Sequence, residues 1–78
     1  MLRPGRGQLL HVGGIDFLFR VEFEASCVLV ERAGAPGGAL KVAIKGGRAP
    51  TPAQLVRSIE LALAQGWVPG AGGRPWNL

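Results

Sequence analysis

Residues 15–23 read Ile-Asp-Phe-Leu-Phe-Arg-Val-Glu-Phe, and every odd position in this stretch carries a large apolar side chain. The even positions are charged except for Leu18. Successive side chains of a β-strand point to opposite sides, so this alternation is typical of a strand with one buried face. A helix would scatter the same residues around its circumference. The segment therefore predicts a strand whose apolar face the rest of the chain must cover.

Two more strands are predicted downstream, because residues 26–32 and residues 40–45 alternate in the same way. A tight turn around residues 25–26 would pair Phe23 with Val28 and keep the apolar sets of both strands on one face. A Pro-Gly-Gly turn signal separates the second strand from the third, and short connections of this kind give an antiparallel meander. The predicted buried face consists of Phe17, Phe19, Val21, Phe23, Val28, Val30, Leu40, Val42 and Ile44.

The N-terminal part of the chain divides in two. Residues 1–8 are rich in Gly, Pro and Arg, and we expect them to be a flexible segment. Residues 9–12 could add a fourth strand, because Gly13-Gly14 is suited to a two-residue hairpin turn. Residues 9–78 are then expected to form a single domain.

A helix start is encoded at residues 51–54, which read Thr-Pro-Ala-Gln. Thr at the N-cap, Pro at the first helical position and Gln at the third make a capping box. We expect the helix to run to about Gln65 and to stop at Gly66. Its apolar stripe is formed by Leu55, Val56, Ile59, Ala62 and Leu63.

The tail, residues 67–78, has no apolar period, but it contains two tryptophans. Disordered tails seldom carry such residues, so we expect it to be ordered and to pack. The predicted fold is therefore α+β: a three- or four-stranded antiparallel meander, a C-terminal amphipathic helix on one of its faces, and an ordered aromatic tail.

The end of the chain also resembles a family. The segments Gly66-Trp67-Val68-Pro69-Gly70 and Gly73-Arg74-Pro75-Trp76-Asn77-Leu78 are similar to the ends of small uncharacterised bacterial proteins, in which a last helix is followed by Gly-Trp-x-Pro and then Gly-x-Pro, an aromatic residue and Leu. The resemblance covers roughly the last third of the chain. It implies only that the tail is a structural element.

Composition limits the classes of function. The chain has 78 residues with a single cysteine, Cys27, which excludes a disulfide-stapled scaffold and a cysteine zinc site. No apolar run approaches the length of a membrane span, and residues 9–16 interrupt any signal-peptide core. We therefore expect a cytoplasmic protein, and the abundance of Gly, Ala, Arg and Pro suggests a bacterial one.

Catalysis would require His11, the only histidine, to lie beside Asp16 or Cys27. No spacing in the sequence predicts such a group. We interpret His11 as a solvated side chain and Cys27 as a small apolar residue in a strand. We therefore expect no enzymatic activity, no cofactor and no metal.

The formal net charge of +4 raises the possibility of nucleic-acid binding. Much of the excess lies near the chain ends, and the acids interleave with the remaining bases. The segment Lys45-Gly46-Gly47-Arg48 precedes the helix start but matches no phosphate-loop spacing. A weak basic nucleic-acid binder is therefore the alternative function, with contacts at Arg3, Arg6, Lys41, Lys45 and Arg48.

A second apolar patch, on the outer face of the predicted sheet, is the reason for the function that we favour. In the predicted sheet, Leu18, Leu29 and Ala43 share the outer face, which one helix cannot cover. The tail, another protein or solvent must therefore meet this patch. Trp76 is a further candidate contact because tryptophan is enriched at interface hot spots. We favour a protein-interaction module or a small homo-oligomer with Leu18, Leu29, Ala43 and Trp76 at its interface.

Overall fold

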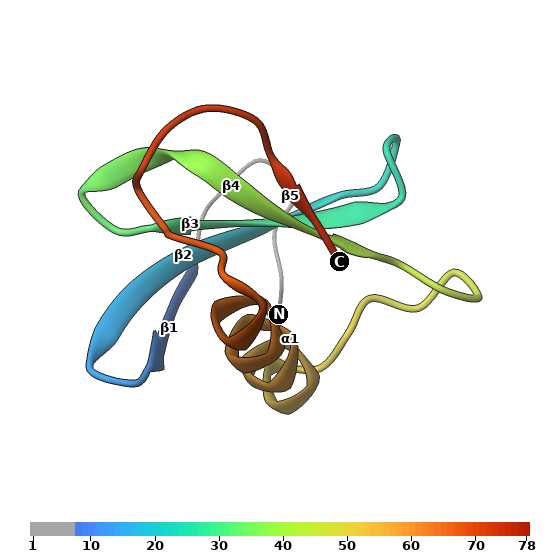
Figure 1. Ribbon diagram of the computed structural model, residues 1–78. Helices are drawn as coiled ribbons and strands as arrows, with labels where there is room; N and C mark the ends of the chain where they lie inside the picture. Colours follow the sequence, from blue (N-terminus) through green and yellow to red (C-terminus); the bar gives the residue numbers. More distant parts are fainter. Residues whose placement is uncertain (1–7) are drawn as a thin grey trace.

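A five-stranded sheet and one helix make up residues 8–78, the part of the chain that the computed structural model describes (Figure 1). The strands are β1 (Gln8–Val12), β2 (Ile15–Glu22), β3 (Cys27–Arg32), β4 (Ala35–Ala43) and β5 (Trp76–Asn77), and the helix α1 is Pro52–Gln65. Strands β1 to β4 form an antiparallel meander, and β5 joins β4 in parallel. The expected mixed α+β fold is confirmed, with five strands where three or four were predicted. Of the predicted flexible segment, only Gln8 lies within the described residues, and it begins β1.

The strand predicted at residues 9–12 is present as β1. Gly13 and Gly14 both have positive φ angles, 57° and 80°. A two-residue hairpin turn whose twist matches the strands needs this geometry at both positions. Val12 and Ile15 face one another across the turn.

The connection between β2 and β3 is longer than predicted. Residues 23–26 form a turn in which Ser26 N–H donates to the Phe23 carbonyl at 3.1 Å. Val28 therefore pairs with Val21 instead of Phe23. The register moves by two residues, so every side chain keeps its face. Phe23, however, leaves the sheet and is 58% exposed, and its predicted place in the core was wrong.

Strand β4 begins earlier than predicted, at Ala35, and ends at Ala43 instead of residue 45. The tight turn lies at residues 33–34, and the Pro-Gly-Gly segment lies inside β4, where the pairing with β3 is irregular. Gly37 and Gly38 take positive φ angles there, which glycine adopts without a Cβ penalty. The Glu31 carboxylate accepts the Gly37 N–H at 3.1 Å, which satisfies one donor of the irregular segment. Sequence alone favoured a turn because these residues usually mark one.

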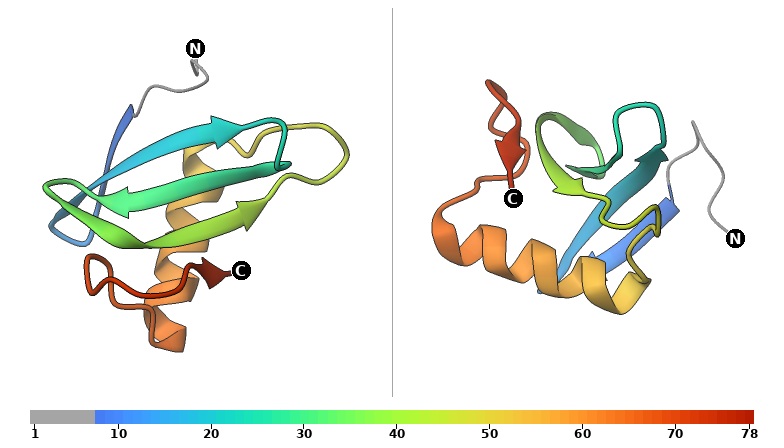
Figure 2. Two further views of the ribbon diagram at one scale, coloured as in Figure 1. Left: turned by 90° about the horizontal axis from the view of Figure 1, so that it is seen from above. Right: turned by 90° about the vertical axis from the view of Figure 1, so that its right-hand side faces the viewer.

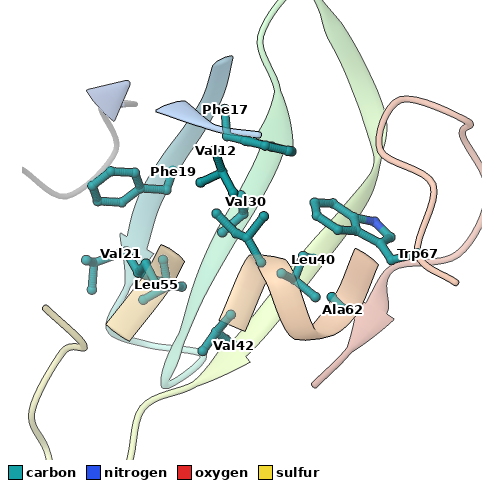
Figure 3. Close-up of a cluster of buried hydrophobic side chains, with 12 residues drawn as sticks. Val12, Phe17, Phe19, Val21, Val30, Leu40, Val42, Leu55, Ala62 and Trp67 are labelled. Atoms are coloured by element: carbon teal, nitrogen blue, oxygen red, sulfur yellow. The ribbon is translucent and has the colours of Figure 1, made fainter. Parts of the chain in front are cut away.

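Helix α1 crosses the apolar face of the sheet (Figure 2). The Thr51 side chain accepts the Gln54 N–H, and the Gln54 side chain accepts the Thr51 N–H, so the predicted capping box is confirmed. Gly66 ends the helix in the left-handed conformation, as predicted. Figure 3 shows the core between sheet and helix. Its buried members are Val12, Phe17, Phe19, Val21, Val28, Val30, Leu40, Val42, Leu55, Ile59, Ala62 and Trp67.

The tail runs along the β4 edge of the sheet. Trp76 lies opposite Leu40 in β4, and Leu78 N–H donates to the Lys41 carbonyl at 3.0 Å. Trp76 and Leu78 are half-buried and pack against the core. The left view of Figure 2 shows the tail beside β4 and the helix behind the sheet. The outer face is therefore not covered by the tail.

Within residues 8–78, the single helix is too short and too polar to cross a membrane.

Candidate interaction surface

The side of the sheet that faces away from α1, here called the outer face, is the surface that no described segment crosses (Figure 2, left). Alternation along each strand assigns its residues. Those with side chains on this face are Leu9, His11, Asp16, Leu18, Arg20, Glu22, Cys27, Leu29, Glu31, Lys41, Ala43 and Asn77.

Three leucines form a diagonal row across this face. Leu9 lies directly opposite Leu18 on neighbouring strands, and the two are 67% and 38% exposed. Leu18 lies opposite Glu31, which makes half-buried Leu29 its diagonal neighbour on β3. The residues Leu9, Leu18 and Leu29, here called the leucine row, thus place an apolar strip across β1, β2 and β3.

Polar side chains on either side of the leucine row contact one another in pairs. His11 Nδ1 lies 2.7 Å from Asp16 Oδ1, with both side chains more than half exposed. Arg20 Nε donates to Glu22 Oε1 at 3.0 Å. Exposed pairs such as these contribute little to stability. The leucine row is thus an apolar strip bordered by polar side chains, which is the common layout of a protein interface.

Two of the predicted interface residues, Leu18 and Leu29, lie together in the leucine row. Ala43 shares the outer face and, because Lys41 lies opposite Leu29, is the diagonal neighbour of Leu29 at the end of β4. Trp76 lies elsewhere, since it packs against the core beside α1. Leu9 was missed by the sequence reasoning. Its position could have been predicted from the Gly13-Gly14 hairpin, because a two-residue turn there places Leu9 opposite Leu18.

Of the candidate catalytic residues, the structure brings His11 and Asp16 together but leaves Cys27 apart from them. His11 pairs with Asp16 near the β1–β2 turn, whereas Cys27 pairs with Glu22 at the other end of β2. Asp16 and Glu22 are six positions apart along β2, a distance of about 20 Å. Cys27 is also buried. In the part of the chain that the structure describes, no group of three or more His, Cys, Asp or Glu side chains is placed to hold a metal ion.

The predicted basic residues gather at one end of the sheet. Lys45 and Arg48 form an isolated bridge around a two-glycine turn, and both are exposed. They border a hollow of about 600 Å³. Its lining consists of Val42, Ala43, Lys45, Arg48, Ala49, Pro50, Thr51, Gln54, Ser58 and Leu78. A smaller hollow of about 210 Å³ lies beside it, and Lys41 is among its lining residues. Arg3 and Arg6 lie outside the described residues.

The basic end also presents Phe23, which the sequence reasoning had placed in the core. The β2–β3 turn that carries Phe23 leaves the sheet where β4 ends, since Cys27 pairs with Ala43. The Ile44 N–H donates to the Ser26 carbonyl at 2.9 Å and ties this turn to the chain after β4. An exposed ring and several cations therefore share one end of the molecule.

Comparisons of this chain with protein-family models, with curated proteins and with solved structures found no match. The functional proposals below therefore depend on the geometry of this chain alone.

Proposed function

We propose that this protein is a protein-interaction module of the bacterial cytoplasm, and that it binds its partner through the leucine row. The observation that carries the proposal is the cross-strand pair of Leu9 and Leu18 on a sheet face that no described segment crosses. The proposal includes no enzymatic activity and no cofactor.

Burial of the leucine row would be favourable. Apolar surface removed from water contributes about 25 cal/mol per Å², so a leucine that becomes fully buried contributes about 1.5–3 kcal/mol. The locally paired charges around the row can remain in water at the rim of an interface. A partner that covers the row therefore gains apolar contacts, while the Glu31 carboxylate opposite Leu18 already accepts the Gly37 N–H.

A matched pair of variants tests this proposal. Leu18→Asp puts a charge into the leucine row, whereas Leu61→Asp puts the same charge at a leucine of α1 that is 51% exposed and outside the row. If the wild-type protein self-associates, we expect Leu18→Asp to abolish that association in sedimentation velocity. If the wild-type protein instead retains another partner in a binding assay, we expect Leu18→Asp to lose that partner. We expect Leu61→Asp to behave as the wild type. Equal behaviour of the two variants in both assays would refute the proposal.

A second candidate function, weak binding of single-stranded nucleic acid, is favoured by the basic end. Stacking of bases on an exposed ring together with backbone contacts to cations is the usual mode of such binding. Phe23 is 58% exposed, and Lys41, Lys45 and Arg48 line the two neighbouring hollows. Titration of a fluorescent oligonucleotide tests it: Phe23→Ala and Lys45→Glu should each weaken binding, and Arg57→Glu on α1 serves as control.

A further inference from the structure

We infer that the partner is a second copy of this chain, and that the two copies join edge to edge through β1 in an antiparallel, two-fold arrangement with Leu10 on the axis. The inference rests on the proposed function, since it names the partner that extends the same outer face. It adds a site that the leucine row alone does not define: the backbone edge of β1, which no other strand within residues 8–78 pairs with.

The hydrogen-bonding pattern of the meander shows which backbone groups reach that edge. The Asp16 carbonyl accepts the Ala33 N–H at 2.9 Å, so even-numbered residues of β2 direct their backbone groups toward β3. The odd-numbered residues of β2 therefore bond to β1, where their partners are the even-numbered ones. It follows that Leu9 and His11 direct their N–H and C=O groups away from the sheet.

This geometry selects one register for the second copy. Two antiparallel edge strands form hydrogen bonds only where residues of both strands direct their N–H and C=O groups toward the other strand. A two-fold axis at Leu10 pairs Leu9 with His11 of the second copy and His11 with Leu9 of the second copy. All the outward groups of Leu9 and His11 are then used. An axis at Leu9 or at His11 leaves one of these residues without a partner inside β1 (Gln8–Val12).

Among residues 8–78, β1 also carries none of the features by which edge strands avoid pairing. Natural edges are usually protected by charged side chains, by proline or by a covering segment. The sequence of β1 is Gln-Leu-Leu-His-Val, and the His11 ring is held by Asp16 of the same copy. The opposite side of the sheet is different, because β5 occupies part of the β4 edge. Two copies could therefore approach along β1 without like-charge repulsion in the strands themselves.

Side chains on the helix side of β1 support the same arrangement. Leu10 is half-buried against the core, as are Val56 and Leu63 of α1. At 100° per residue, Val56 and Leu63 lie on the flank of α1 opposite to Gln54 and Ser58. Gln54 and Ser58 line the hollow near β4. Val56 and Leu63 therefore face the β1 side of the sheet.

A strand added at β1 would extend over these half-buried side chains. In the proposed register, Leu10 lies beside Leu10 of the second copy as a non-hydrogen-bonded pair, the closer kind of cross-strand pair. On the outer face, Leu9 becomes the diagonal neighbour of Leu9 of the second copy. The leucine row would thus continue from one copy into the other.

Proline substitution at the edge tests the pairing directly. His11→Pro removes an N–H that makes no bond inside the sheet, and proline is tolerated on edge strands in this orientation. His11→Ala is the matched control, because it loses the same ring and the same contact with Asp16 but keeps the N–H. We expect wild type and His11→Ala to sediment as dimers, and His11→Pro to associate at least tenfold more weakly. Circular dichroism should show that both variants fold.

Cysteine cross-linking tests the register. In a Cys27→Ala background, Leu10→Cys should form a disulfide dimer on mild oxidation, because the two Leu10 positions meet on the axis. Leu9→Cys should not, since diagonal neighbours lie about 7–8 Å apart, beyond the reach of a disulfide. Preferential cross-linking at Leu9 would overturn the register.

The outcomes separate this inference from the proposed function. If His11→Pro dimerises like His11→Ala, or if the wild type is a monomer at every concentration, edge pairing is wrong. The proposed function still stands in either case if Leu18→Asp alone loses a partner. If His11→Pro loses the dimer while Leu18→Asp behaves as the wild type, the copies join at the β1 edge without the leucine row, and binding through the row is refuted.

Discussion

The indole Nε1–H of Trp67 donates a 2.7 Å hydrogen bond to the carbonyl oxygen of Gly38. This bond joins the residue after the helix stop to the irregular segment of β4. The Trp67 ring also stacks on Phe17 of β2, with ring centroids 5.8 Å apart. A single buried side chain thereby fixes the end of α1 against two strands, and the tail leaves for the β4 edge from that fixed point.

We predict that Trp67→Phe destabilises the protein by about 1–3 kcal/mol, because it leaves the buried Gly38 carbonyl without its donor. Chemical denaturation followed by circular dichroism measures the free energy of unfolding. Trp76→Phe is the control, since Trp76 is only half-buried. Equal losses in the two variants would contradict the importance of this hydrogen bond.

The two phenylalanines at opposite ends of the β2 pattern should behave differently. Phe19 is 3% exposed, and Phe19→Ala should cost about 3–5 kcal/mol through the cavity it leaves. Phe23 lies on the turn, and Phe23→Ala should change stability by about 0.5 kcal/mol or less. Thermal or urea unfolding of the two variants measures both changes in stability. A large loss for Phe23→Ala would place its ring in the core after all.

The capping box should contribute measurably to the helix. Thr51→Ala removes the oxygen that accepts the Gln54 N–H, and the expected cost is about 1 kcal/mol. Thr51→Ser keeps a hydroxyl at the same position and should cost much less. Urea denaturation of both variants measures the difference, and an unaffected Thr51→Ala variant would show that the cap is not needed.

Salt should distinguish the two candidate functions. Each copy of the chain carries a formal net charge of +4, so screening should leave self-association unchanged or strengthen it. Binding to nucleic acid should weaken steeply with salt, because cations of the protein displace condensed counterions. Sedimentation and oligonucleotide titration over the same salt series measure both. Self-association that falls with salt would indicate an ionic interface instead of the leucine row.

The sequence predicted the elements whose signals are local. The capping residues of α1 lie within one turn, and the alternation of β2 depends on neighbouring positions only. The β2–β3 register was wrong by two residues because turn length depends on packing beyond the turn itself. Side chains of a strand repeat every two residues, so a shift of two leaves each side chain on its predicted face. Of the predicted core residues in β2 and β3, only Phe23 was misplaced.

Longer-range features could not be predicted. Strand β5 spans Trp76–Asn77, and its pairing with β4 depends on where Trp67 anchors the tail. Trp76 was predicted at an interface because of its residue type, and its packing against the core could not be predicted from the sequence. Leu9 was omitted because its strand was uncertain, although it is the most exposed large apolar side chain among residues 8–78.

The pairing of β5 with β4 has a consequence for the size of any assembly. A sheet with two open borders can add copies without limit and grow into fibres. Here the tail pairs with part of the β4 edge. A two-fold contact at the β1 edge would occupy that edge in both copies at once. Growth would therefore stop at a pair, which lets an unguarded strand persist without polymerisation.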